Sequence, residues 1–235
     1  MENNGVSYIF PSDVNIELFS LPKTAIQKNI SFEPREYIIE SIIPDKNEIL
    51  KSILYSNPNM PFGYIDKGNN ETRTIEDAST LLDYEIKKIL KTLVTKDADE
   101  NIYMVVTFGN YHPNLKKIKH LSEIFRNAHD IDGPLKLHMI DSEQVEKFIG
   151  MPAGFCGPVL FNKDYIINKV DEKNVKGILF HHKIKKTQQR YTIKEKYIMI
   201  TFPISKNESI LIHPRDLYEK LKDKCGEDKI SFFKE

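Results

Sequence analysis

Two stretches, Ile89–Thr95 (ILKTLVT) and Ile102–Phe108 (IYMVVTF), decide the fold class of this 235-residue chain. Both are rich in β-branched and aromatic residues, which is typical of β-strands. The polar segment Asp97–Asn101 between them can turn the chain so that the two stretches pair. The second stretch is apolar almost throughout, which indicates a strand that is buried on both faces. We therefore predict a pair of strands with Ile102–Phe108 near the centre of a sheet.

Helical patterns and further strand patterns flank this pair. Thr74 is followed by acidic residues in the first turn, a typical helix start, with Ala78, Leu81 and Leu82 expected toward the core. Further helices are predicted after Pro44, over Asn114–Phe125, from Asp141 or Ser142 to Ile149, and over Pro214–Lys224. Short strands are predicted over Leu135–Ile140, Gly157–Phe161, Tyr165–Val170, Gly177–Phe180, Tyr197–Phe202 and Ser209–His213. This interleaving favours the α/β or α+β class with a mixed sheet.

Composition excludes several classes of protein. The 34 basic and 34 acidic residues balance, which excludes a strongly basic nucleic-acid coat protein and an acidic disordered chain but not a local basic face. Two cysteines are too few for a disulfide framework and indicate a reducing compartment. No apolar run approaches the roughly 20 residues that span a bilayer, and the N-terminus lacks the pattern of a secretory signal. We expect a soluble, cytoplasmic globular protein.

The sequence offers little support for a metal or cofactor. Cys156 and Cys225 are isolated, and the adjacent His181 and His182 would point to opposite faces of a strand. Neither the phosphate-binding glycine motifs nor G-x-S-x-G occurs. A cysteine nucleophile would have to be Cys156, which has no supporting motif. We expect no cofactor and no metal.

The most distinctive segment is Gly150–Pro158 (GMPAGFCGP), with three glycines and two prolines directly after a predicted helix. Glycine permits positive φ and close approach of a ligand, and successive N–H groups in such a loop can bind a carbonyl oxygen or phosphate. The same residues also suit an ordinary helix end followed by a turn, which composition alone favours.

Lys91 is the second unusual residue, because it interrupts the apolar strand pattern of Ile89–Val94. A charge at this position must face either water or a cleft. Taken alone, the pattern favours a half-exposed strand with a solvated lysine.

Together these features resemble the YbaK/prolyl-tRNA synthetase editing-domain family. The similar features are, in order, Ile89–Val94 with Lys91, the β-type stretch ending at Phe108–Gly109, Leu115–Lys117, the helix pattern Asp141–Ile149, the loop Gly150–Pro158, and the closing stretch Ile198–Leu217. In the family the loop is of the type G-x-x-x-G-x-x-G-P. The resemblance extends from about Thr74 to Leu221 and leaves the first 60 residues uncovered.

The resemblance implies a mixed, partly barrel-like β-sheet flanked by helices, and an aminoacyl-tRNA deacylase. Its implied reaction is removal of a wrong amino acid from tRNA, most directly alanine from prolyl tRNA, with cysteine as the alternative. The implied partners are mischarged tRNA(Pro) and a prolyl-tRNA synthetase core in cis or in trans, without a membrane. A non-catalytic tRNA-binding or synthetase-docking module with the same fold is the alternative from another class.

The resemblance also implies which residues act. Lys91 would anchor the 3′-terminal nucleotide or the substrate carbonyl, and the backbone of Gly154 and Gly157 would polarise the ester carbonyl. A positioned water, helped by the terminal ribose hydroxyl, would replace a protein nucleophile. The implied substrate-binding residues are Gly150, Ala153, Phe155, Cys156, Pro158 and Thr92.

Basic residues are the candidates for phosphate contact with the tRNA, first among them Lys116, Lys117, Lys185 and Lys186. Solvated helix faces in a lysine-rich chain are the alternative interpretation.

The sequence departs from the family in two places: some members carry a histidine where this chain reads Glu195–Ile198, and a polar insertion lies at Lys183–Gln189. We divide the chain into an N-terminal extension, residues 1–60, and an editing domain, residues 61–235.

Overall fold

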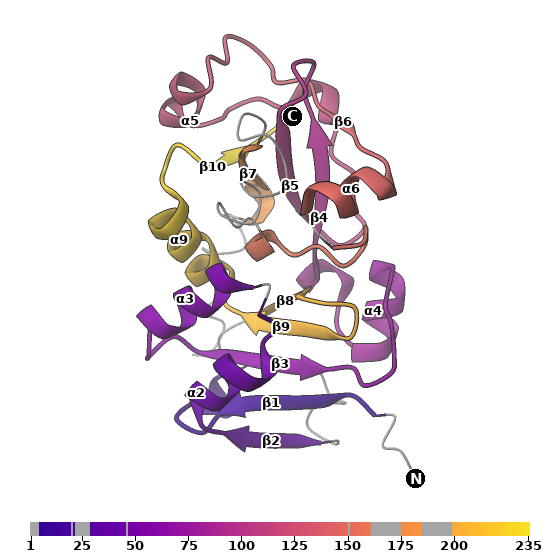
Figure 1. The fold of residues 1–235 in the computed structure, drawn as a ribbon, viewed down its shortest axis with the longest axis vertical. Helices are drawn as coiled ribbons and strands as arrows, with labels where there is room; N and C mark the ends of the chain where they lie inside the picture. Colours follow the sequence, from indigo (N-terminus) through magenta and orange to yellow (C-terminus); the bar gives the residue numbers. More distant parts are fainter. Residues whose placement is uncertain are drawn as a thin grey trace.

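The computed structural model describes residues 5–19, 21, 29–45, 47–149, 151–160, 175–184 and 199–235. These residues form two five-stranded mixed sheets flanked by helices, stacked along the long axis of the molecule (Figure 1). The predicted mixed α/β class is therefore confirmed. Each sheet is open in the part of the chain described, so the fold is not a closed barrel. The predicted strand Tyr165–Val170 lies outside these residues.

The first sheet contains the strand pair that the sequence analysis began with. Its order is β10-β7-β5-β4-β6, with bounds Ile230–Phe233, Val175–His181, Ile102–Phe108, Leu90–Lys96 and His138–Met139. β5 is its middle strand and pairs antiparallel with β4 and parallel with β7. The predicted central position of Ile102–Phe108 is confirmed, whereas β10 is a strand that the sequence analysis missed.

The second sheet combines the N-terminal segment with the closing hairpin. Its order is β2-β1-β3-β9-β8, with bounds Ile30–Glu33, Ser7–Pro11, Phe62–Asp66, Glu208–Ile212 and Ile200–Pro203. β8 and β9 pair antiparallel, and strands were predicted for both segments, over Tyr197–Phe202 and Ser209–His213. β1 pairs with β3, which in turn pairs with β9. The proposed division after residue 60 stays a prediction, although strands on both sides of it share this sheet.

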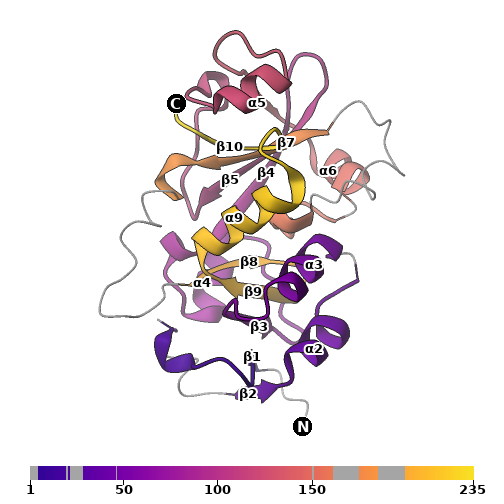
Figure 2. The same ribbon diagram turned by 90° about the vertical axis from the view of Figure 1, so that its left-hand side faces the viewer.

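Helices cover the sheets and the space between them. The helices are α2 (Arg35–Tyr37), η2 (Ile38–Ile42), α3 (Glu48–Ser56), α4 (Ile75–Leu82), α5 (Glu123–Ala128), α6 (Ser142–Ile149) and α9 (Pro214–Cys225). Single turns are η1 (Ile16–Leu18), η3 (Ile86–Lys88), η4 (Leu115–Lys117) and η5 (Pro158–Leu160). α9 crosses between the sheets beside α3 (Figure 2). The predicted capping of α4 is confirmed, because Thr74 and Asp77 form a reciprocal capping box.

Two predicted elements are wrong, and a third is shorter than predicted. Asn114–Phe125 is not one helix: η4 ends at Lys117, His120 has a φ of 54°, and α5 starts only after its cap Ser122. The apolar spacing there reflects separate burial of Ile118 and Phe125. Pro158–Leu160 forms a helical turn in place of a strand, as expected where proline fixes φ. Leu135–Ile140 is a strand only at His138–Met139.

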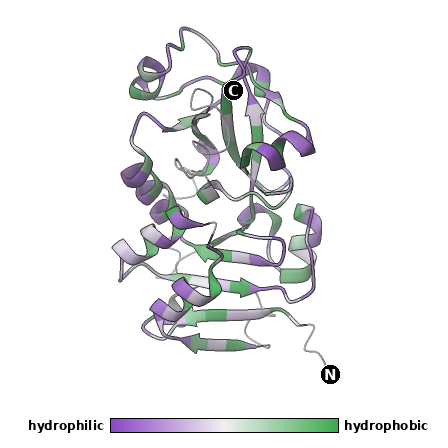
Figure 3. Cartoon of the chain, in the orientation of Figure 1, coloured by the Kyte–Doolittle hydropathy of each residue, from purple (hydrophilic) through white to green (hydrophobic). Residues whose placement is uncertain are grey.

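The apolar side chains form one large core and two smaller ones. The largest core joins both sheets and includes Leu90, Val94 and Cys156 together with the inner face of α9. The strands are mostly hydrophobic, while hydrophilic residues gather on the helices (Figure 3). Leu93 packs against a different core, on the other face of the first sheet. β4 therefore separates two apolar compartments, and its edge lies between the two sheets.

Candidate functional site

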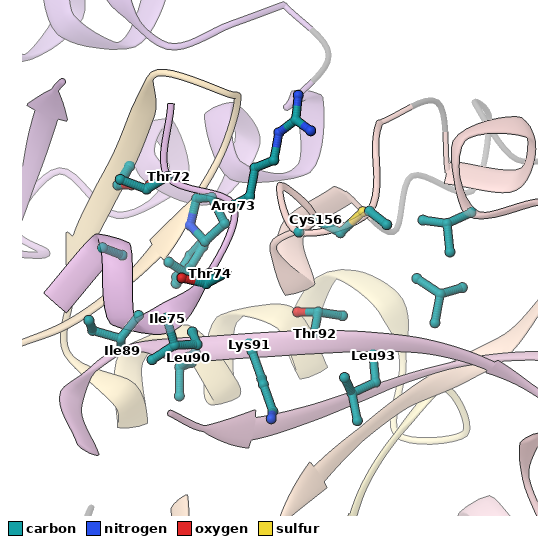
Figure 4. A pocket seen from close by; sticks show the side chains of 18 of the residues that line it. Thr72, Arg73, Thr74, Ile75, Ile89, Leu90, Lys91, Thr92, Leu93 and Cys156 are labelled. Atoms are coloured by element: carbon teal, nitrogen blue, oxygen red, sulfur yellow. The ribbon is translucent and has the colours of Figure 1, made fainter. Parts of the chain in front are cut away.

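A cavity of about 370 Å³ lies where the two sheets meet. Its walls come from the edge of β4, the start of α4, strand β8, the start of α6 and the loop after α6 (Figure 4). Five of the residues singled out from the sequence line it: Lys91, Thr92, Ala153, Gly154 and Cys156. The structure thus brings together the two unusual features of the sequence, which lie about 60 residues apart in the chain.

The β4 edge in this cavity carries backbone groups with no strand beside them. Strand β6 pairs with this edge only at Thr95 and Lys96. Next to this pairing, Ile140 N–H donates a hydrogen bond to Val94 O at 3.4 Å. Since backbone groups alternate along a strand, those of Thr92 point to the same edge as those of Val94. Among the described residues, no strand pairs with this edge at Thr92.

Lys91 and Thr92 contribute to the cavity from opposite sides of β4. The side chains of Lys91 and Leu93 leave the strand on one side, and that of Thr92 leaves on the other, toward Cys156 (Figure 4). The Lys91 side chain is half-buried. Burial lowers the pKa of its ammonium, and the nearby carboxylate of Glu76 partly offsets this by raising it. The site therefore holds a partly desolvated positive charge.

The loop after α6 contains a tight turn that requires glycine. Phe155 N–H donates to Pro152 O at 3.1 Å, and Gly154 has a φ of 91°, the combination of a type II turn. A Cβ on Gly154 would lie 2.8 Å from the carbonyl oxygen of Arg73. The turn thus rests directly on the segment that leads into α4. Phe155 N–H is used inside the turn, and Ala153 and Gly154 of the same turn line the cavity.

The other predicted site residues that the structure describes do not line the cavity. Gly157 is buried, and a Cβ there would lie 2.5 Å from Pro203 O, so it allows close packing against β8. Phe155 and Pro158 are also buried in the core side of the loop. Lys116 and Lys117 are exposed on η4. Gly150, Lys185 and Lys186 lie outside the described residues.

The cavity also has lining residues that the sequence analysis did not propose. They come from the segment before α4 and from the β8–β9 hairpin, and include Thr72, Arg73, Thr201 and Ser209. Thr201 is a single polar residue in the apolar stretch Ile198–Phe202, and that interruption was the available signal. Thr72 accepts a hydrogen bond at 2.9 Å from the ammonium of Lys67, which is fully buried. Together with Thr92, these residues place several hydroxyl-bearing side chains around one cavity.

Cys156 is expected to resist alkylation in the folded protein. Burial raises the pKa of its thiol to about 12, so the reactive thiolate is scarce at neutral pH. We expect iodoacetamide to label Cys156 at least about 100-fold more slowly in the folded than in the unfolded chain. Cys225, which is less buried, provides an internal comparison by mass mapping. Fast, stoichiometric labelling of Cys156 at neutral pH would contradict this assignment of an unreactive thiol.

The described residues contain no group of three or more His, Cys, Asp or Glu side chains that could hold a metal ion. Within the same residues, no helix is long and apolar enough to span a membrane.

Comparison with known families identifies the segment that supplies most of the cavity lining. Residues 69–193, just over half of the chain, match the model of the family described as "Aminoacyl-tRNA editing domain". This match includes Lys91 and the loop Gly150–Pro158. The match begins close to the start of the resemblance inferred from the sequence, at about Thr74, and ends at residue 193, before the closing stretch Ile198–Leu217.

Curated relatives share sequence with this chain, and a solved structure shares its fold. The chain is 30% identical to a proline–tRNA ligase of Thermosipho africanus over 107 residues, 46% of the chain and 17% of that protein. It is 44% identical to a proline–tRNA ligase of Francisella philomiragia over 52 residues, 22% of the chain and 9% of that protein. The crystal structure of hypothetical protein APE2540 has the same fold, with a TM-score of 0.54 and 16% identity over 80% of this chain and 99% of that one. The chain thus spans less than a fifth of the curated relatives that it matches.

Proposed function

Because this chain belongs to the aminoacyl-tRNA editing domain family, we propose that it hydrolyses the ester bond of mischarged prolyl tRNA. The observation that carries the proposal is a cavity lined mostly by the family-matched segment, including Lys91 and Thr92 of the β4 edge and Gly154 of the turn. Alanine on prolyl tRNA is the first substrate that the resemblance implies, and cysteine is the alternative.

The proposed mechanism needs no protein nucleophile. The thiol of Cys156 is kept protonated by burial, and an aminoacyl ester is already activated toward attack by water. Positioning of that water and stabilisation of the developing oxyanion then supply the rate. The ester carbonyl oxygen would face the backbone N–H groups of Ala153 and Gly154, two residues that line the cavity. The charge of Lys91 would stabilise either this oxyanion or the 3′-terminal nucleotide.

Exposed lysines support contact with the rest of the tRNA. Lys116 and Lys117 have no ion pair among the described residues, so their charges are available to phosphates. We propose a cytoplasmic role beside a prolyl-tRNA synthetase core, in cis or in trans. The strands before residue 60, joined to the β8–β9 hairpin through β3, are the candidate contact with that core.

A binding module that kept the fold without activity is the second candidate. Its supporting observation is that the curated matches cover only 9% to 17% of the length of the ligases. Presence of both Lys91 and a glycine-dependent turn at one cavity favours the enzyme, since docking alone requires neither.

The test is hydrolysis of prolyl tRNA charged with alanine, cysteine or proline by the purified full chain. We expect release of alanine or cysteine at least about 100-fold faster than without protein, with proline retained. The ester that is hydrolysed faster, that of alanine or that of cysteine, identifies the substrate. Equal hydrolysis of all three, including the correct product, would contradict an editing role.

A further inference from the structure

Three charged residues line the cavity in the part of the chain that the structure describes: Arg73, Glu76 and Lys91. The guanidinium of Arg73 already has an ion-pair partner, because it lies 3.6 Å from the carboxylate of Glu71. No hydrogen bond or ion pair joins the side chain of Glu76 or Lys91 to another described residue. One carboxylate and one ammonium are therefore left for a ligand in the same cavity.

Glu76 reaches the cavity from the first turn of α4, and it is exposed. Burial lowers the pKa of the Lys91 ammonium, and the charge of Glu76 raises it. Such an effect requires the two charges to lie near each other. Because they do not form an ion pair, a ligand with complementary charges can contact both.

An aminoacyl ester has this complementary polarity. Its α-ammonium is positive at neutral pH, since an α-amino group has an ordinary pKa of about 7.7–8.0. The ester carbonyl, bonded to the same carbon, develops negative charge on its oxygen during hydrolysis. In the proposed mechanism Lys91 or the Gly154 turn stabilises that oxygen. Glu76 is the one carboxylate among the described lining residues that can accept hydrogen bonds from the α-ammonium.

We propose that the Glu76 carboxylate binds the α-ammonium of the scissile amino acid and thereby orients its ester carbonyl toward Lys91 and the Gly154 turn. The inference rests on the proposed deacylase function. The contact is independent of the amino-acid side chain, so it applies to the alanine and the cysteine ester alike. Esters without a positive charge on the α-carbon substituent are then poor substrates.

Two other roles for Glu76 make different predictions. An acid in the first turn of a helix complements the helix dipole, which affects only the stability of α4. An acid near Lys91 also favours the protonated form of that lysine, which affects every ester equally. Neither role depends on the α-ammonium of the substrate. Substrates that differ only in this group therefore separate the three roles.

The test compares prolyl tRNA charged with alanine and the same tRNA carrying a lactyl ester. In the lactyl ester a neutral hydroxyl replaces the α-ammonium at nearly the same size. Each kcat/KM is divided by the spontaneous hydrolysis rate of its ester, because the α-ammonium itself activates the ester. We expect the wild-type chain to prefer the alanyl ester by at least about 10-fold after this correction.

Glu76→Gln removes the charge and keeps the size of the side chain. We expect it to lower kcat/KM for the alanyl ester by about 10-fold and to leave the lactyl ester unchanged, so that the preference is lost. Glu76→Asp keeps the charge on a shorter side chain and is expected to retain part of the preference. Circular dichroism establishes folding of each variant, and the wild-type ratio is decisive by itself if Glu76→Gln does not fold.

Glu143→Gln is the matched control. Glu143 is an exposed acid in the first turn of α6, so its substitution removes the same charge from the same position in a helix. It follows the lining residue Ser142 but does not itself line the cavity. Both esters should be hydrolysed at the wild-type rates.

Three results would overturn the inference. The first is equal corrected rates for the two esters with the wild-type chain, and the second is an unchanged ratio in folded Glu76→Gln. In both of these the proposed deacylase function stands, because hydrolysis of the alanyl ester is observed. The third is absence of hydrolysis of either ester by the wild-type chain, which overturns the proposed function and this inference with it.

Discussion

Replacing Lys91 by alanine is expected to lower kcat/KM for a mischarged prolyl tRNA by about 100- to 1000-fold, the cost of removing one oxyanion stabiliser. The half-buried ammonium lies at the cavity, where its field is weakly screened compared with bulk water. Steady-state kinetics separates the two roles left open for it. A fall in kcat assigns it to the carbonyl, and a rise in KM assigns it to the terminal nucleotide.

The effect of Lys91 is also expected to depend on pH. Because burial lowers its pKa, the ammonium loses its proton at a pH below the ordinary lysine value of 10.5. As pH rises through that lowered pKa, the wild-type rate should approach that of Lys91→Ala after correction for spontaneous ester hydrolysis. Lys96→Ala is the control. Lys96 lies on the same strand, but its ammonium pairs with the Glu100 carboxylate at 2.7 Å, and Lys96 does not line the cavity. A folded Lys91→Ala variant with full activity would refute this assignment.

Gly154→Ala is the second substitution with a large expected effect. An L-residue is strained at a φ of 91°, and its Cβ would meet the Arg73 carbonyl oxygen at 2.8 Å. We expect a loss of about 1–3 kcal/mol in the free energy of unfolding. We also expect an about 100-fold loss in kcat/KM, because the turn and the segment before α4 must move apart.

Gly133→Ala provides the matched control for this glycine. Gly133 is in a loop and lacks a positive φ, and a Cβ added there would meet no heavy atom within 4 Å beyond its chain neighbours. Its substitution should change neither the unfolding free energy nor the rate measurably. Wild-type activity in Gly154→Ala would show that the turn conformation is not required at the site.

The sequence predicted the parts of the fold that local patterns determine. The apolar runs of β4 and β5 and the capping residues of α4 were each sufficient, and the helices predicted after Pro44 and over Pro214–Lys224 correspond to α3 and α9. The helix predicted over Asn114–Phe125 failed because the left-handed backbone of His120 interrupts it, although the apolar spacing looks helical. β10 was missed because Ile230–Phe233 is a short segment without alternation, whose pairing with β7 and packing against Tyr218 of α9 form only in the folded chain.

The candidate site was predictable only where the residues were themselves unusual. Lys91 and Gly154 stood out as a charge in an apolar strand and a glycine in a glycine-rich loop. Thr201 and Thr72 did not, because the closing hairpin and the start of α4 approach β4 only in the folded chain. The opposite directions of Lys91 and Thr92 do follow from strand alternation. Tertiary packing decides which of these two side chains points toward the Gly154 loop.

The measurement that tests the central claim most directly is single-turnover hydrolysis of mischarged prolyl tRNA with the wild-type chain in excess, alongside a filter-binding assay of the same tRNA. We predict ester cleavage at least about 100-fold above the spontaneous rate at protein concentrations that saturate binding. Saturated binding with cleavage at the spontaneous rate would contradict the deacylase and identify a tRNA-binding module.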